Sequence, residues 1–411
     1  MVNLFNKFNN IKNDEKKVVK RLTSSVKLAD KKKFYQPISE KKFGTQHDNE
    51  KKSFFITNGG EKNLEKKVFI RKEELLEKRK KISPIQREVF CKGIESPLNI
   101  FLDILSSKTL QNLKLEYAAI KSYIFPEHTR NAFDHNMTLN KYKDIVCIDQ
   151  TRVNLDPPGP YYYHGNFVYQ LGMKHNFICC QGPMDDTIVD FWRLCIQKKV
   201  SIIICLVNII ENGKKKCSQY WPSNEGETIK FKHINVHYKS TDNCDDSFFI
   251  RNFKVWIDGI DNVTYRIRQI HWKDWPDKSV PPVTTPVMRL MRRLRDLRAD
   301  ETILAHCSAG IGRTGTLVAA VMLFSKISAK SDINVYDTVM DLRRQRAGAV
   351  QTEIQYIYLH KIIIDYCLII NVFSEARKSS AIKFIEKYNS YYESLLQAGS
   401  QPQNGNLLHN F

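Results

Sequence analysis

The sequence predicts an α+β fold in which one large domain carries most of the 411 residues. Hydrophobic residues make up 42% of the chain and aromatic residues 11%, which is enough to bury a large core. Short β-like runs fill the middle of the sequence, and segments with helical spacing stand on both sides of them. We expect the folded domain over residues 86–375, an arm over residues 1–85, and a C-terminal helix and polar tail over residues 376–411.

The arm is basic, and we expect it to be mostly disordered. Residues 1–90 hold 24 Lys and Arg against 12 Asp and Glu, so they carry +12 of the formal net charge of +20. A segment rich in Lys, Asn, Glu and Ser buries too little apolar surface to fold. An acidic protein or an anionic membrane surface is the kind of partner it would attract, and nucleic acid is not firmly implied. A solubilising role is the plainer alternative.

The ordered part begins with helical spacing and continues with strands. Helices are expected at residues 96–105 and 110–125, and again at 187–197, where Thr187 is the candidate N-cap. Strands are expected at residues 144–149, 167–172, 177–180, 201–207, 229–238, 248–257 and 263–272. A helix at 286–298, a strand at 301–307, and helices at 312–324, 335–345, 352–370 and 379–397 complete the domain.

The cysteines and the apolar runs limit where the protein works. Ten cysteines are scattered through the chain, with one adjacent pair and no zinc-like spacing with histidine. The chain starts without the apolar stretch of a signal peptide, and its longest apolar run, residues 202–210, is too short to be a transmembrane segment. Free thiols then indicate a reducing compartment, so we expect a cytoplasmic protein and leave the nucleus open.

The stretch AHCSAGIGRTG, residues 305–315, carries the chemistry and has two interpretations. Gly310, Gly312 and Gly315 follow the G-x-G-x-x-G spacing of a dinucleotide-binding turn between a strand and a helix. That fingerprint needs a second strand ending in an acidic residue about 20 positions later. Here the following segment is polar and then helical, and no Gly-Lys-Ser/Thr of a Walker loop is present.

The second interpretation uses Cys307 as a nucleophile and Arg313 as its cationic partner. The residues between them can point successive N–H groups inward and so form a nest for a tetrahedral oxyanion. Glycines at 310 and 312 permit the positive φ angles that such a turn needs. The next helix adds its positive end, Arg313 can bind two phosphate oxygens, and the cysteine pKa can fall to roughly 3.5–7.5. The residues of this nest are Ser308, Ala309, Gly310, Ile311 and Gly312.

HCSAGIGRTG resembles the signature of the cysteine-dependent protein tyrosine phosphatases, and every defining position matches. The resemblance covers about residues 100–372. It implies a central twisted mixed β-sheet flanked by helices, and hydrolysis of phosphotyrosine in protein substrates through a phosphocysteine. Thr314 would hydrogen-bond the sulfur and aid its later departure, and His306 would orient the turn. No cofactor or metal is implied, because Arg313 and the nest supply the positive charge.

Two further segments resemble the family's acid and glutamine loops. In HWKDWPDKSVP, Asp277 would protonate the leaving phenol and then activate water, Trp275 would serve as a hinge, and Asp274 is expected at the surface. In QRAGAVQTEIQYIYL, Gln351 would position the attacking water and Gln355 would assist.

Other segments resemble the family's phosphotyrosine loop and its glutamate hairpin. In LNKYKDIVCID, Tyr142 would stack on the substrate ring and Asp144 would accept N–H groups of the bound peptide, although Lys141 stands where the family has Arg and Leu139 where it has Lys. In ENGKKKCSQYWP, Glu211 would pair with the catalytic arginine and Lys216 would approach the acid loop.

YYYHGNFV fits the family poorly, because His164 and Gly165 replace Asn and Ala. Three rival functions stay open: a catalytically silent domain that binds phosphotyrosine, a phosphatase for phosphoinositide or phosphoserine, and the nucleotide-binding protein considered above. Tyr142 and Gln351 favour tyrosine over the second of these. Intact Cys307, Arg313 and Asp277 speak against the first.

Overall fold

The computed structural model describes residues 84–245, 247–260, 263–299 and 301–400. The expectations for the N-terminal arm and the polar tail fall outside these residues. From Gly93 onward the described chain belongs to one compact unit. The domain boundaries expected from the sequence stay predictions.

The helices follow the spacing of apolar residues closely. They are α3 (Pro84–Ser106), α4 (Leu110–Ser122), α5 (Asn131–His135), η1 (Met137–Leu139), η2 (Asp185–Thr187), α6 (Ile188–Gln197), α7 (Thr285–Arg295), α8 (Arg313–Ser328), α9 (Val335–Gln345), α10 (Glu353–Ile370) and α11 (Glu375–Ser400). In α4 the buried residues are Leu113, Tyr117 and Ile120, which share one face of the helix. A capping box fixes its start: the Thr109 side chain accepts from the Asn112 amide, and the Asn112 side chain accepts from the Thr109 amide. Thr187 stands at the expected N-cap of α6, but its side chain makes no cap hydrogen bond to that helix.

The strands form one mixed sheet and a small hairpin. They are β1 (Arg152–Asn154), β2 (Tyr162–Val168), β3 (Asn176–Cys180), β4 (Val200–Cys205), β5 (Ile210–Glu211), β6 (Lys214–Lys215), β7 (Thr228–Phe231), β8 (Ile234–Asp245), β9 (Phe248–Ile257), β10 (Tyr265–Trp272) and β11 (Thr302–His306). The large sheet has the order β1-β2-β3-β11-β4-β10-β9-β8-β7. Its four central strands, β3, β11, β4 and β10, are mutually parallel, and the pairs outside them are antiparallel.

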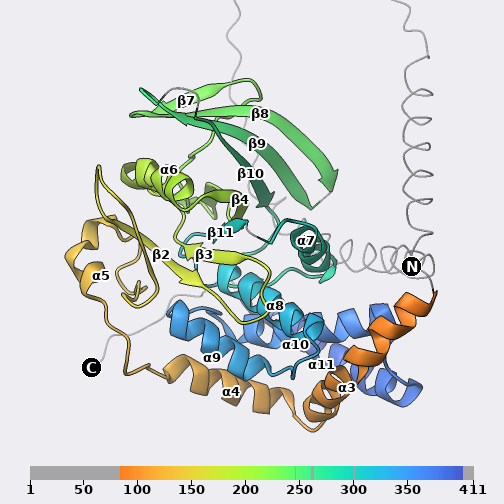
Figure 1. Cartoon of the computed structure of the whole chain (residues 1–411). Helices are drawn as coiled ribbons and strands as arrows, with labels where there is room; N and C mark the ends of the chain where they lie inside the picture. Colours follow the sequence, from red (N-terminus) through yellow and green to blue (C-terminus); the bar gives the residue numbers. More distant parts are fainter. Residues whose placement is uncertain (1–83, 246, 261–262, 300, 401–411) are drawn as a thin grey trace, which may run out of the picture. The chain divides into compact units, whose positions relative to one another are not determined.

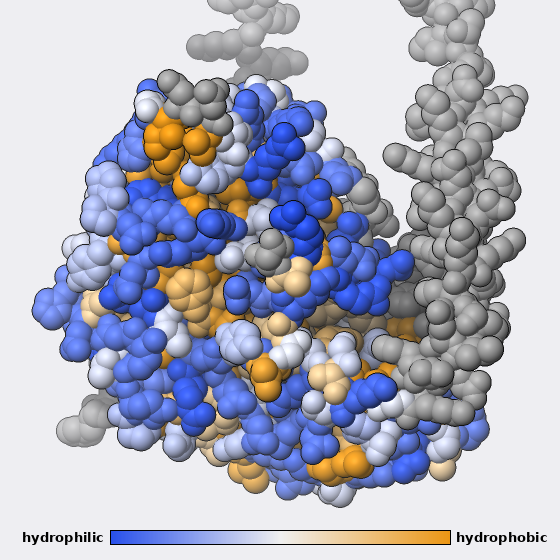
Figure 2. All heavy atoms as spheres, in the orientation of Figure 1, coloured by the Kyte–Doolittle hydropathy of each residue, from blue (hydrophilic) through white to orange (hydrophobic). Residues whose placement is uncertain are grey.

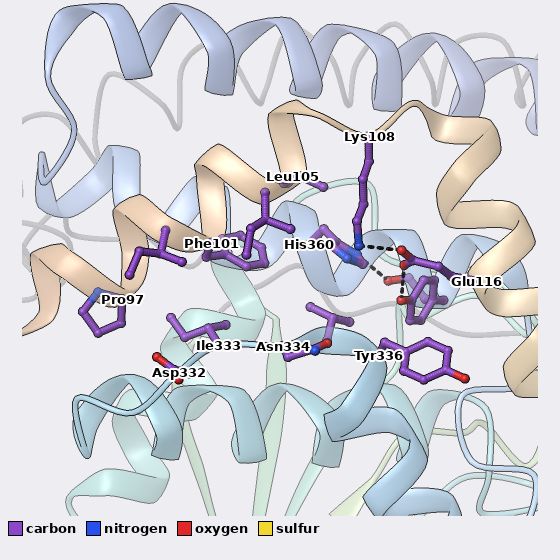
Figure 3. A pocket seen from close by; sticks show the side chains of 14 residues that line it. Pro97, Phe101, Leu105, Lys108, Glu116, Asp332, Ile333, Asn334, Tyr336 and His360 are labelled. Carbon is purple, nitrogen blue, oxygen red and sulfur yellow. Dashed lines mark hydrogen bonds and ion pairs between the residues drawn. The ribbon is translucent and has the colours of Figure 1, made fainter.

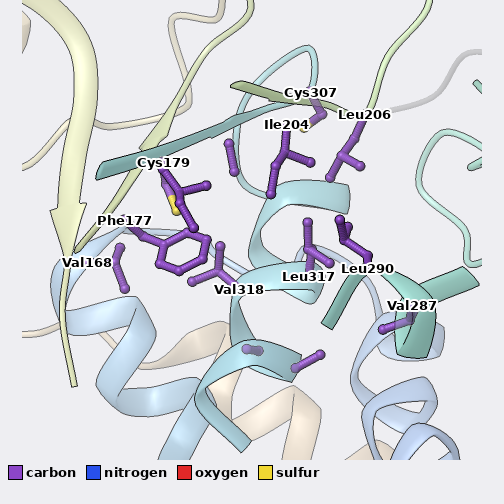
Figure 4. Packing of buried hydrophobic residues seen from close by; sticks show 14 of the residues in the cluster. Val168, Phe177, Cys179, Ile204, Leu206, Val287, Leu290, Cys307, Leu317 and Val318 are labelled. Carbon is purple, nitrogen blue, oxygen red and sulfur yellow. The ribbon is translucent and has the colours of Figure 1, made fainter. Parts of the chain in front are cut away.

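Helices cover both sides of the sheet, as the resemblance implied. Figure 1 shows α8, α9 and α10 gathered on one side and α6 on the other. In Figure 4, Leu317 and Val318 of α8 face Phe177 of β3 and Ile204 of β4 across the core, and all four side chains are fully buried. The face shown in Figure 2 is largely hydrophilic, with apolar side chains in separate patches. Among the described residues, no helix is both long and apolar enough to cross a membrane.

Three expected strands differ in the structure. Residues 144–149 form a loop, because side chains bind their backbone instead of a neighbouring strand: His164 Nε2 lies 2.7 Å from the Ile145 carbonyl and Asn166 Nδ2 lies 3.0 Å from the Ile148 carbonyl. The strand expected at residues 167–172 is the end of β2, which stops at Val168. The strand expected at 229–238 is two strands, β7 and β8, joined by a turn in which Lys232 has a φ of 55°.

Candidate active site

The residues singled out in the sequence meet at the carboxyl ends of the parallel strands. Strand β11 ends at His306, so Cys307 follows directly, and α8 begins six residues later at Arg313. In an open sheet, this edge is where ligands bind. Figure 4 shows Cys307 at the edge of the packed core, beside Ile204 and Leu206 of the neighbouring strand and its following loop.

The turn from Cys307 to Arg313, which we call the phosphate cradle, depends on its glycines in two different ways. Gly310 has a φ of +73°, and a Cβ there would lie 2.0 Å from the carbonyl oxygen of Cys180. Gly312 does not have the positive φ that we expected, since its φ is −77°. Its missing side chain instead leaves room for Gln351, whose Oε1 would lie 2.8 Å from a Cβ. No other residue fits either position without moving its neighbours.

The sulfur of Cys307 is buried and lies close to groups that favour its anionic form. The residue is 3% exposed, and the Gly310 amide donates to its Sγ over 3.2 Å. Burial by itself raises the pKa of this thiol, but the Arg313 guanidinium and hydrogen bonds from Thr314 and Gly310 outweigh burial and leave the pKa below its usual value. The surroundings of Cys307 therefore favour its thiolate form, as its expected role as nucleophile requires.

The other cysteines show the opposite behaviour. The structure describes the side chains of eight cysteines, and all are free and buried. Burial raises the pKa of the other seven: Cys147, Cys179, Cys180, Cys195, Cys205, Cys217 and Cys367. Within this group, only the cysteine in the cradle is activated.

Two neighbours of the sulfur shape the cradle from its ends. His306 is fully buried and lies between the Cys307 carbonyl, 3.2 Å from its Nδ1, and the Tyr220 hydroxyl, 2.8 Å from its Nε2. Burial lowers the pKa of His306 to about 4, so this imidazole stays neutral and orients the turn through hydrogen bonds. The Thr314 hydroxyl is buried close to the Cys307 sulfur, where it helps to lower the pKa of that thiol.

Arg313 is fixed by a paired carboxylate. Its two terminal nitrogens bind Glu211 in the bidentate manner, at 2.6 Å to Oε1 and 2.9 Å to Oε2. Arg313 is 2% exposed, and Glu211 sits on the β5–β6 hairpin. A bidentate pair sets the plane of the guanidinium as well as its position. The hairpin therefore fixes the direction in which Arg313 faces the cradle.

The acid loop, residues 273–284, places Asp277 against the same arginine. Asp277 Oδ1 lies 3.2 Å from Arg313, and its Oδ2 lies 2.8 Å from the Lys216 ammonium. Burial raises the pKa of Asp277, but the Lys216 hydrogen bond and Arg313 prevail and hold the pKa below its usual value. Trp275 is buried, and its Nε1 donates to the Ser279 carbonyl over 3.0 Å, while Asp274 is exposed, as expected.

Tyr142 stands at the mouth of the cradle and is tied to it. Its hydroxyl lies 2.9 Å from the Ser308 hydroxyl, which in turn donates to the Lys216 carbonyl over 2.7 Å. Tyr142 is half-buried, so part of its ring is open to a substrate, and Asp144 is exposed beside it. The Tyr142 ring is therefore fixed next to the cradle by its hydroxyl.

The glutamine loop closes the site from the other side. Gln351 follows Val350, which has a φ of +59°, and the Gln351 side chain lies against Gly312. Gln355 accepts from the Gln351 amide over 2.9 Å and donates to the Ser279 carbonyl over 3.3 Å. Its amide thus connects the glutamine loop to the acid loop.

Sequence reasoning gave no role to two cations next to the cradle. Arg346 is fully buried, and its guanidinium donates to the carbonyls of Gly310, at 3.1 Å, and Ala309, at 2.9 Å. These carbonyls point away from the N–H groups of the nest, so Arg346 holds the nest in shape from outside. Lys141, which replaces the family's arginine, donates its Nζ to the Lys216 carbonyl. The only available signal was a basic residue close to each recognised motif.

Residues 161–168, the segment that fits the family poorly, bind Arg346 through two side chains. His164 Nδ1 lies 3.1 Å from one Arg346 nitrogen, and Asn166 Oδ1 accepts from another over 2.8 Å. Burial and the Arg346 charge lower the pKa of His164 to about 3, so its imidazole is neutral and can accept from the cation. At Gly165 a Cβ would approach the Cys180 Cβ to 2.9 Å, which explains the glycine.

A separate hollow of about 330 Å³ lies between α3 and α10 and contains none of these residues. Apolar side chains such as Phe101 and Leu105 line one part of it. At the other end, Glu116 pairs with Lys108 at 2.5 Å and accepts from Tyr356 at 2.7 Å (Figure 3). Because none of its lining residues belongs to the cradle or to the loops around it, this hollow is not part of the chemical site.

Comparison with known proteins agrees with this geometry. The family model described as "Protein-tyrosine phosphatase" matches residues 136–365, more than half of the chain. Tyrosine-protein phosphatase 69D of Drosophila melanogaster is 34% identical over 261 residues, 61% of this chain, and receptor-type tyrosine-protein phosphatase C of Mus musculus is 33% identical over 238 residues, 56% of this chain. The aligned part is 18% of each of these two relatives, so the chain spans less than a fifth of their length.

Solved structures cover a similar part. The catalytic domain of human protein tyrosine phosphatase non-receptor type 18 superposes with a TM-score of 0.58 and 28% identity, over 65% of this chain and 99% of that one. The Trypanosoma cruzi protein tyrosine phosphatase TcPTP1 gives a TM-score of 0.58 and 26% identity, over 64% and 95%.

Proposed function

The chain belongs to the protein-tyrosine phosphatase family, and from this premise we propose that it hydrolyses phosphotyrosine in proteins through a phosphocysteine intermediate. The observation that carries the proposal is that one buried arginine acts on both the nucleophile and the general acid. Arg313 stabilises the thiolate of Cys307 and also contacts Asp277 at 3.2 Å. Nucleophile, cation and acid therefore converge on one small space.

The first step transfers the phosphoryl group to sulfur. The Cys307 thiolate attacks phosphorus, an S–P bond forms, and the bond to the tyrosine oxygen breaks. The electron pair leaves on that oxygen, and Asp277 supplies the proton that neutralises it. The amides of the cradle and Arg313 bind the equatorial oxygens, where charge is spread in the transition state.

The second step returns the thiolate. Gln351 positions a water molecule for in-line attack, Asp277 accepts its proton, and inorganic phosphate leaves as the S–P bond breaks. The placement of Gln351 against Gly312 supports this role, because the water must approach phosphorus from the side that the phenol has left. Thr314, beneath the sulfur, assists the thiolate as a leaving group.

The depressed pKa of Asp277 has to be reconciled with its role as an acid. In this structure its carboxylate faces two cations, Arg313 and Lys216, and both favour its ionised form. A bound phosphate dianion would neutralise Arg313 and place negative charge close to the carboxylate. Both changes raise the pKa of Asp277, so we expect the acid to become competent when the substrate binds.

Tyrosine is the favoured substrate because of the depth of the site. Tyr142 is held by Ser308 at the mouth, and an aryl ring is long enough to place phosphorus at Cys307 while stacking on it. A serine phosphate is shorter and has no ring to stack. The free, buried cysteines support a reducing compartment, so we propose the cytoplasm as the place of action.

A turnover assay tests the function. The full chain is given matched peptides with phosphotyrosine or phosphoserine, and a phosphoinositide in micelles, and phosphate release is measured. We expect the highest kcat/KM with phosphotyrosine and none with the variant C307S. Tight binding of phosphotyrosine without turnover would instead identify a silent binding domain, and a preference for the phosphoinositide would identify a lipid phosphatase.

A further inference from the structure

The last described helix, α11, lies beyond the segment that the family model matches, yet one of its residues contacts the acid loop and another contacts the start of α10, next to the glutamine loop. The match ends at residue 365, and α11 spans Glu375–Ser400. The Tyr392 hydroxyl donates to the Val280 carbonyl over 3.3 Å, and the Tyr391 hydroxyl donates to Glu353. Val280 follows Asp277 by three residues, and Glu353 follows Gln351 by two.

We propose that α11 clamps both loops of the site, and that Tyr392 is a positioning residue for the general acid. This inference rests on the proposed function. It concerns a helix to which the family match assigns nothing, and it names a contact through which that helix acts on Asp277.

The Val280 carbonyl needs this contact. Val280 is fully buried, and within the described part of the chain Tyr392 is the only donor that reaches its oxygen. The loop carbonyls on either side have donors from elsewhere: Gln355 and Trp275 bind Ser279, and Tyr358 binds Val283. A buried carbonyl without a donor is costly, so the Tyr392 hydroxyl favours the loop conformation seen here.

A row of aromatic rings fixes the hydroxyl in place. Tyr392 is 7% exposed and stacks on Tyr388, with ring centroids 6.2 Å apart and an angle of 9° between planes. Tyr388 packs on Tyr358 at 6.4 Å, and Tyr358 packs on Trp275 of the acid loop at 6.5 Å. The acid loop and α11 therefore contact each other both through this row and through the hydrogen bond.

Tyr391 forms the second half of the clamp. Its ring lies beneath the Lys114 ammonium, 3.8 Å from the centroid, and Lys114 also pairs with Glu353 at 3.4 Å. Glu353 is in the first turn of α10, where Gln355 holds the Gln351 amide. This arrangement fixes the start of α10 and, with it, the glutamine loop.

The mechanism predicts a specific kinetic signature. Without the Tyr392 hydroxyl, the acid loop spends less time with Asp277 at Arg313. Protonation of the leaving group then slows, whereas binding of the phosphate in the cradle is unaffected. The loss should appear in kcat and not in KM, and it should depend on how much help the leaving group needs.

The experiment compares Y392F with Y388F in the full-length chain. Y388F is a matched control, because the Tyr388 hydroxyl is buried without a hydrogen-bond partner among the described residues and its ring survives the change. With a phosphotyrosine peptide, we expect Y392F to lower kcat about fivefold, the factor for one neutral hydrogen bond, with KM unchanged. With an aryl phosphate of low leaving-group pKa, the change should be smaller. Y388F should match the wild type throughout.

The same pair is then placed in a D277N background. If Tyr392 acts through Asp277, adding Y392F to D277N should cost nothing further. A fivefold loss that persists in D277N, or an equal loss in Y388F, would show a general structural effect and overturn the inference. An active wild type with Y392F unchanged would also overturn it and leave the proposed function standing. A wild type inactive on phosphotyrosine would overturn both.

Discussion

Replacing Arg346 with methionine tests whether the cradle is held from outside. Arg346 donates to the carbonyls of Ala309 and Gly310 and also contacts His164 and Asn166. Methionine has similar length and fills the space, but it donates nothing. The variant therefore removes the hydrogen bonds and largely keeps the packing.

The expected loss follows from the groups left without partners. The buried Gly310 carbonyl and the half-buried Ala309 carbonyl lose their donor. At about 1–3 kcal/mol for each buried group, and less for the half-buried one, the free energy of unfolding should fall by about 3 kcal/mol. At 2–4 °C for each kcal/mol, Tm should fall by roughly 10 °C. The N–H groups of the nest should no longer point correctly at the phosphate oxygens. We therefore expect kcat/KM to fall by on the order of 10² or more, as for the loss of an oxyanion donor.

Arg343 provides the matched control. It is also buried on α9 and donates to three carbonyls, those of Ile120, Ala349 and Val350, none of which belongs to the cradle. R343M should lower Tm by a similar amount and leave kcat/KM nearly unchanged, since kcat/KM reports the steps up to phosphocysteine formation, before Gln351 acts. The assays are thermal unfolding by circular dichroism and turnover of a phosphotyrosine peptide well below the melting range.

Equal effects of R346M and R343M on kcat/KM would refute the reasoning, because the cradle would then depend on general stability alone. If R346M kept the Tm of the wild type, the predicted loss of stability would be wrong, because the two carbonyls would have found other donors.

Three further outcomes are expected. The rate of Cys307 alkylation by iodoacetamide should stay high as the pH falls below 8.5 and should decline only near the lower pKa of the folded thiol. A rate that halves near pH 8.5 would show that the cradle does not lower the pKa of Cys307. D277N should lower kcat for phosphotyrosine by on the order of 10²–10⁴, and by much less for an aryl phosphate with a good leaving group; equal losses would remove Asp277 as the acid. G310A should abolish activity and lower Tm, because its Cβ meets the Cys180 carbonyl, whereas G213A, with a similar φ of +72° and nothing within 4 Å, should cost about 1 kcal/mol and keep full activity.

The residues to which we assign the chemistry could be singled out in the sequence because each belongs to a short, contiguous motif, and the structure brings them together. Cys307 and Arg313 stand six positions apart in one turn, and Asp277 lies within its own tripeptide. The strand–turn–helix context of the cradle is equally local. Helix α9 was predicted to the residue, and the start of α10 to within one residue.

The supports of the site could not be predicted, because their partners are backbone carbonyls far away in the sequence. Arg346 binds a carbonyl 36 residues away, and Tyr392 binds one 112 residues away. A carbonyl has no sequence signature, so only the fold shows which one a buried side chain meets. The strand predicted at residues 144–149 was wrong for a related reason. Their apolar pattern predicted a strand, but the side chains of His164 and Asn166 bind the backbone carbonyls that a neighbouring strand would have used.

Because the pKa of Cys307 is lowered and the pKa of the other seven described cysteines is raised, a thiol reagent can count active sites in this protein. In a chain with C91S and C244S, the two cysteines whose side chains the structure does not describe, each correctly folded molecule would consume one equivalent of a haloacetamide near neutral pH. Labelling stoichiometry would then count competent molecules in a preparation directly, and turnover numbers could be expressed per functioning centre without a separate standard.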